Sequence, residues 1–98
     1  MENTKLASFQ ELKKWLNLDF DDNKDSIEAM ACGIEGYITF GTGLDLATLA
    51  EVRPIAYVLA RNYLQQKLYM QYYGTYDEHV EASCQAIIEQ LKILAVSG

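Results

Sequence analysis

The chain has 98 residues, of which 50% are hydrophobic and 11% aromatic. This is enough for one domain with its own apolar core, and it excludes both a two-domain protein and an intrinsically disordered one. Asp and Glu number 14 against 8 Lys and Arg, so the formal net charge is -6, which argues against a surface built to grip phosphates. We therefore expect a single domain over residues 1–98.

The first predicted helix begins at Ser8. Ser8 and Glu11 form the S-x-x-E pattern, in which each side chain accepts a hydrogen bond from a free backbone N–H at the helix start. Apolar residues follow at helical spacing, namely Phe9, Leu12, Trp15 and Leu16. The helix is expected to end near Asn17, where an acidic turn follows.

The acidic turn has the alternating oxygen ligands that open a calcium-binding EF-hand loop, namely Asp19, Asp21, Asn23 and Asp25. The pattern then fails, because Lys24 takes the place of the required glycine and Met30 that of the bidentate glutamate. A solvated turn that caps the next helix is favoured instead, since acidic side chains stabilise a helix N-terminus.

The second predicted helix runs from about Asn23 or Asp25 to about Phe40, and Gly41 and Gly43 mark its end. One face repeats apolar residues at steps of three and four, namely Ile27, Met30, Ala31, Ile34, Tyr37 and Ile38. The Gly41–Gly43 turn is too short for a phosphate-binding loop and follows no strand, so we interpret it as the end of the helix.

Two glycines, Gly33 and Gly36, lie inside this predicted helix. Each costs about 1 kcal/mol of helix propensity relative to Ala. They indicate either close approach by another backbone or a local weakness in the helix, and the sequence does not decide between these alternatives.

The third predicted helical segment spans roughly Leu46 to Tyr73, and Pro54 either kinks it or begins its longer second portion. Beyond the proline, one apolar stripe is formed by Ile55, Ala56, Leu59, Tyr63 and Met70, and another by Tyr57, Leu64 and Leu68. A helix that is apolar on more than one side is either central to its domain or shared with a partner.

Gly74 breaks this pattern, and Thr75 with Glu78 offers a second capping box for the last helix. A continuous apolar stripe then runs to the C-terminus through Val80, Cys84, Ile87, Ile88, Leu91, Leu94 and Ala95. Strand-like alternation of useful length is absent from the sequence. The predicted fold is therefore all-α, an antiparallel bundle of about four helices.

Residues suited to chemistry are few. His79 is the only histidine and has acidic neighbours, and no nucleophile with a base at suitable separation accompanies it. Cys32 and Cys84 lie in helical contexts and are interpreted as reduced packing residues. We expect no enzyme activity, no cofactor and no metal. No apolar run of about 18 residues is present, so we expect no membrane span and a protein made in the cytoplasm.

The most suggestive cluster is aromatic and lies around Gly74. It comprises Tyr69, Met70, Tyr72, Tyr73 and Tyr76. A small bundle has limited interior volume at one end, and Tyr and Met are enriched at protein interfaces. We take these five residues as candidates for a protein–protein contact, with ordinary core packing as the alternative.

The order of these features resembles the head-tail connector family of tailed bacteriophages, often labelled DNA-packaging proteins. The resemblance covers Phe9 to Lys92. It includes the short helix containing Glu11–Leu16, the acidic turn, and the segment Tyr37–Gly43 that closes the second helix. The apolar helix at Tyr57–Lys67 and the ending Ile87–Lys92, with Lys in place of the usual Arg, complete the similarity.

The resemblance implies a structural adaptor with no cofactor. About a dozen copies would form a ring that docks beneath the portal protein, contacts a tail-side head-completion protein, and lets DNA pass without specific binding. The protein would reside at the head-tail junction of the virion, and in the bacterial cytoplasm during assembly. A rival hypothesis is a small helical regulatory or inhibitor protein that binds one partner. A helix-turn-helix DNA binder is disfavoured because no predicted helix has a basic face.

Overall fold

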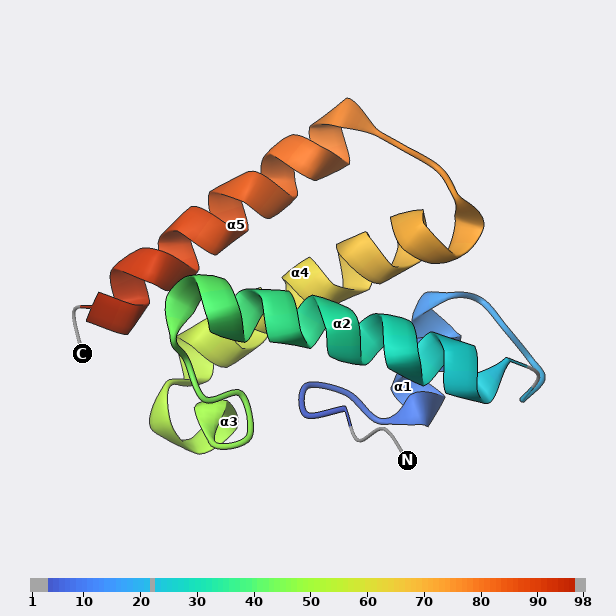
Figure 1. The fold of residues 1–98 in the computed structure, drawn as a ribbon, viewed down its shortest axis with the longest axis horizontal. Coiled ribbons are helices and arrows are strands. Elements are labelled where there is room, and N and C mark those ends of the chain that lie inside the picture. The colour runs from blue at the N-terminus through green and yellow to red at the C-terminus, as the bar shows by residue number, and fades with distance from the viewer. Residues whose placement is uncertain (1–3, 22, 97–98) are drawn as a thin grey trace.

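The computed structural model describes residues 4–21 and 23–96, which form five helices and no strand within those ranges. The helices are α1 (Phe9–Trp15), α2 (Lys24–Thr42), α3 (Leu49–Val52), α4 (Pro54–Tyr73) and α5 (Glu78–Val96). Helix α4 runs antiparallel to both α2 and α5 and packs against both, and α2 also contacts α5 (Figure 1). The predicted all-α bundle is confirmed, and the additional helix is the four-residue α3.

The helix ends follow from local sequence in most places. Ser8 accepts a hydrogen bond from the Glu11 N–H and Glu11 accepts one from the Ser8 N–H, so the predicted capping box of α1 is confirmed. Pro54 is the first residue of α4 and does not kink a longer helix. Its ring disfavours helical backbone at Arg53, which separates α3 from α4.

The predicted end of α2 at its glycines is confirmed, because the helix continues through Gly41 to Thr42 and ends at Gly43, whose φ of 77° suits glycine. At the start of α2, Asn23 makes no side-chain cap hydrogen bond, and the acidic Asp25 lies in the first turn. The predicted cap of the last helix was wrong. At α5 the cap is Asp77 rather than Thr75, because the Asp77 carboxylate accepts hydrogen bonds from the N–H groups of His79 at 2.8 Å and Val80 at 3.2 Å.

The core lies where α4 packs between α2 and α5. Its fully buried side chains include Ile27, Ile38, Leu64, Leu68, Cys84 and Leu91. Helix α1 closes one end with Leu12 and Leu16, and α3 closes the other with Leu49. The predicted stripe of α5 is confirmed as the face that meets this core.

A buried carboxylate holds the N-terminal segment against α2. Glu35, 4% exposed, accepts hydrogen bonds from the Lys5 N–H at 3.0 and 2.9 Å and from the Leu6 N–H at 2.8 Å. On the other side, the Arg61 guanidinium donates to the Leu6 carbonyl at 3.0 Å. The segment is thereby clamped between α2 and α4, with Leu6 buried.

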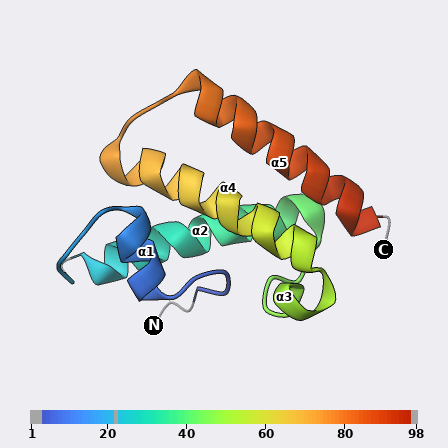
Figure 2. The same cartoon turned by 180° about the vertical axis from the view of Figure 1, so that it is seen from behind.

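The described part of the chain is a slab of 41 × 31 × 19 Å. Helix α2 lies on one broad side, nearest the viewer in Figure 1. Figure 2 shows the opposite broad side, where no other helix covers α4. The two broad sides therefore present different helices to solvent.

Candidate functional site

The exposed residues of α4 include no charged residue. They are Pro54, Ile55, Val58, Asn62, Gln65, Tyr69, Gln71 and Tyr73. All but Pro54 and Gln71 recur at steps of three and four, so they share one side of the helix. We call this side the α4 outer face and define it as Ile55, Val58, Asn62, Gln65, Tyr69 and Tyr73. Charge depletion with exposed aromatic and aliphatic side chains is typical of the centre of a protein–protein interface.

The two charged residues of α4 point to its flanks, where each has a partner. The Arg61 guanidinium forms an ion pair with Glu11 at 2.6 Å and holds the pKa of the Glu11 carboxyl below its usual value. Lys67 forms an ion pair with Glu81 of α5. Both cations form ion pairs within the subunit, and neither lies on the α4 outer face, which is therefore uncharged.

The tyrosines predicted as an interface are clustered at the end of α4. The rings of Tyr69 and Tyr73 lie 4.8 Å apart between centroids, and those of Tyr72 and Tyr73 lie 5.0 Å apart in an edge-to-face contact. The Tyr73 hydroxyl donates to the Leu16 carbonyl at the end of α1. Tyr69 and Tyr73 are each 42% exposed, so they extend the α4 outer face to the end of the helix.

The other three predicted residues have different environments. Tyr76 is 71% exposed and, together with Met70, Trp15 and Val80, lines a hollow of about 400 Å³ between α4 and the start of α5. Met70 is buried, and Gln65 and Tyr69 of the α4 outer face also line this hollow. Tyr72 is half-buried and packs against the core.

Sequence analysis missed the aliphatic part of the surface. Ile55, which shares a predicted apolar stripe with the buried Ala56, is 72% exposed, and Val58, which was in neither stripe, is 56% exposed. The signal was present in the sequence: along the whole α4 outer face, no Lys, Arg, Asp or Glu occurs at any of the six positions. The pattern was missed because apolar residues occur on both sides of this helix.

The structure predicts different roles for Tyr72 and Tyr76 in stability. Tyr72→Ser should lower the free energy of unfolding by about 1–2 kcal/mol, because its ring packs against the core. Tyr76→Ser, at an exposed position, should change it by less than about 0.5 kcal/mol. Urea unfolding followed by circular dichroism measures both. Equal effects would contradict this division of the cluster.

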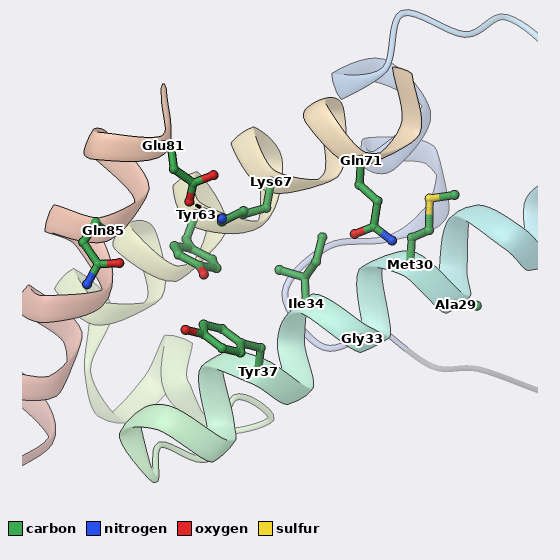
Figure 3. Close-up of a pocket in the computed structure, with 10 residues that line it drawn as sticks. All are labelled: Ala29, Met30, Gly33, Ile34, Tyr37, Tyr63, Lys67, Gln71, Glu81 and Gln85. Atoms are coloured by element: carbon green, nitrogen blue, oxygen red, sulfur yellow. Dashed lines mark hydrogen bonds and ion pairs between the residues drawn. The ribbon is translucent and has the colours of Figure 1, made fainter. Parts of the chain in front are cut away.

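A groove lies on the opposite broad side of the molecule. Its volume is about 560 Å³, and α2, α4 and α5 line it with Ala29, Met30, Gly33, Ile34, Tyr37, Tyr63, Lys67, Gln71, Glu81 and Gln85 (Figure 3). Tyr37 stacks on Tyr63 with ring centroids 6.4 Å apart. Burial, followed by the nearby Tyr37, raises the pKa of Tyr63 to about 12, so this hydroxyl stays protonated at neutral pH.

The groove contains charges of both signs, paired with each other. Figure 3 shows the Lys67 ammonium directed at the Glu81 carboxylate across the groove wall. The wall formed by α2 is bare at Gly33, where an added Cβ would meet no atom within 4 Å. The charges that line the groove therefore cancel, and its α2 wall has no side chain at Gly33.

The residues that could support chemistry remain separate. His79 is exposed at the start of α5, and Cys84 is buried in the core, where burial raises the pKa of its thiol. Within residues 4–21 and 23–96, no group of three or more His, Cys, Asp or Glu side chains is placed to share a metal ion. No described helix is long and apolar enough to cross a bilayer.

No protein-family model, curated protein or solved structure matches this chain. Inference about function therefore rests on the chain's own surfaces and on the resemblance in its motifs.

Proposed function

We propose that this protein is a self-assembling structural adaptor, a subunit of the ring that joins head and tail in a tailed bacteriophage. One observation carries the proposal: the α4 outer face is uncharged along a 20-residue helix in a protein of net charge -6. A 20-residue helix is about 30 Å long, which is long enough to span a typical subunit contact. Such a surface is best explained by a protein that covers it.

The order of the sequence motifs supports the proposal that this contact belongs to a phage connector ring. The short capped helix, the acidic turn and the Tyr37–Gly43 segment resemble head-tail connectors, and the described helices accommodate that order. In a ring, each subunit must offer two different surfaces, so that contacts repeat around an axis and close. The α4 outer face supplies one candidate for these surfaces.

The charge of the protein suits a passage for DNA. Every phosphate neutralised by Lys or Arg adds salt-dependent binding affinity for DNA, and a channel that binds DNA tightly would slow its passage. The net charge of -6 and the internal pairing of Arg61 and Lys67 leave few cations for such contacts. The ring would therefore guide DNA between portal and tail-side completion protein without specific binding.

Val58→Glu should prevent assembly while leaving the subunit folded. Val58 is 56% exposed, so the subunit tolerates the charge, but a covered carboxylate without a partner is costly in an interface. We expect association to weaken at least about tenfold. Gln90→Glu adds the same charge at an exposed position of α5, outside the α4 outer face, and should assemble normally. Sedimentation velocity and circular dichroism on the same samples measure both.

The function itself is tested with a portal protein: the proposal predicts a portal gene close to the gene for this chain, and the product of that gene is the partner to use. Purified chain mixed with portal rings should give, by electron microscopy, a ring of about a dozen copies beneath each portal. A monomer or dimer that ignores the portal would contradict the proposal and favour the regulatory protein of the rival hypothesis. Val58→Glu should abolish the ring on the portal, and Gln90→Glu should not.

A further inference from the structure

We infer that the hollow between α4 and the start of α5 binds an arginine side chain from a partner protein that is not a copy of this chain. We call it the Tyr76 hollow. Its volume of about 400 Å³ lies within the range of about 300–1,000 Å³ that is usual for ligand pockets. The inference rests on the proposed function, in which protein covers the α4 outer face, and it adds the chemistry of one partner.

The walls of the Tyr76 hollow combine aromatic rings with a single charge. The aromatic side chains that line it are Trp15, Tyr69 and Tyr76. Met70 and Val80 add apolar surface, and Asp77 is the only charged residue among the described residues that line it. The faces of aromatic rings attract cations that lie within about 6 Å of the ring centre. The hollow therefore favours a cationic group with an apolar stem.

Asp77 has one carboxylate oxygen that no group of the subunit uses. Its Oδ1 accepts both cap hydrogen bonds, from the N–H groups of His79 and Val80, and no described residue donates to Oδ2. The ion pairs formed among the described residues include neither Asp77 nor the next residue, Glu78. The negative charge at the hollow is therefore balanced by no cationic side chain of the described chain, and a cationic partner complements it.

The chain binds one of its own arginines with the same combination of groups. The Arg61 guanidinium lies over the rings of Trp15 and Tyr57, at 5.3 and 5.6 Å from their centroids. It also forms an ion pair with Glu11 at 2.6 Å. The Tyr76 hollow offers rings and a carboxylate without a guanidinium. Arginine suits such a site better than lysine, because its planar guanidinium stacks on rings and donates hydrogen bonds in a fixed geometry.

The arginine comes from a different protein, because this chain has none that is free to bind a second copy. Its two arginines are Arg53 and Arg61. Arg53 donates a hydrogen bond to the Leu94 carbonyl at 2.8 Å, and Arg61 is paired with Glu11. Both guanidinium groups therefore form contacts inside the subunit.

The Tyr76 hollow is continuous with the α4 outer face. Gln65 and Tyr69 belong to that face and also line the hollow. A protein that covers this part of the face therefore brings its own side chains to the hollow. In the proposed function, the proteins above and below the ring are such partners.

Binding of N-acetyl-arginine methylamide to the purified chain tests the site. NMR shifts of the indole N–H of Trp15, the only tryptophan, and of the Val80 N–H report binding. N-acetyl-citrulline methylamide has nearly the same shape without the charge, and it should bind at least about threefold more weakly. N-acetyl-lysine methylamide should also bind more weakly than the arginine probe, because an ammonium group does not stack on rings as a guanidinium does.

Asp77→Asn removes the charge of the hollow and keeps the helix cap, because Asn caps a helix as well as Asp does. It should melt close to the wild type and bind the arginine probe about threefold more weakly or worse. Asp45→Asn is the matched control, because Asp45 is also exposed and accepts a backbone N–H, from Ala47 at 3.1 Å. This control does not line the hollow and should bind the probe as the wild type does.

Equal affinity for the arginine and citrulline probes would overturn the site, as would an arginine affinity that Asp77→Asn leaves unchanged. Tighter binding of the lysine probe would overturn the assignment to arginine and the exclusion of a second copy. These measurements use the chain alone, so they are separate from the portal experiment. Rings on the portal without arginine binding would retain the proposed function and contradict this inference, and arginine binding without rings would do the reverse.

Discussion

Leu91→Asp should leave the chain unfolded at room temperature. Leu91 has 0% exposure in the middle of the α5 stripe, where that helix packs against the core. A carboxylate buried there without a partner, together with the lost apolar burial, should cost about 4 kcal/mol or more. A domain of this size has few kcal/mol in reserve, so one such change is enough to unfold it.

Circular dichroism during thermal and urea unfolding measures this effect. Ile93→Asp is the matched control, because it puts the same carboxylate on the same helix two residues away, at a side chain that is 61% exposed. We expect Ile93→Asp to melt close to the wild type. A cooperative, native-like transition for Leu91→Asp would show that this side of α5 faces solvent and that the packing described above is incorrect.

Glu35→Gln should release the N-terminal segment and destabilise the domain. Both oxygens of Glu35 accept backbone N–H groups, and an amide has only one oxygen, so its NH₂ group would face a donor. Hydrogen bonds to a charged group contribute about 1.5–3 kcal/mol each, and the amide keeps at most the two bonds that Oε2 accepts now, without the charge. We expect a loss of about 3 kcal/mol in the free energy of unfolding.

Urea unfolding gives the stability, and hydrogen exchange at Lys5 and Leu6 reports the release directly. Glu89→Gln is the control, because its carboxylate is exposed on α5 and contacts Lys92 at 3.4 Å, where an ion pair contributes little. We expect this variant to change stability by less than about 0.5 kcal/mol. Unchanged protection of Lys5 and Leu6 in Glu35→Gln would mean that the charge of Glu35 is not needed to hold the segment.

Some features of this protein could be predicted from sequence because their causes are local. The Ser8–Glu11 capping box, the end of α2 near its glycines, and the first turn of α4 at Pro54 each depend on residues within one helical turn. The α5 stripe follows from a period of 3.6 residues, which any helix of that sequence would present to its core. Fold class and helix order were therefore predictable.

The residue that caps α5 could not be predicted from local sequence alone. Thr75 and Asp77 both lie before the helix, and each could accept N–H groups from its first turn. The choice depends on how far α5 unwinds toward α4, which the packing of the two helices determines. The structure places the cap at Asp77, so the helix begins later than Thr75 would require.

The candidate surface was decided by tertiary structure for a physical reason. The sequence determined an all-α domain with apolar residues on more than one side of α4, but burial depends on which sides α2 and α5 cover, and no local rule supplies that. Packing therefore left Ile55 and Val58 exposed, buried Met70, and divided the tyrosines between core and surface. It also made Glu35 a clamp, because its partners Lys5 and Leu6 lie about thirty residues away in the chain.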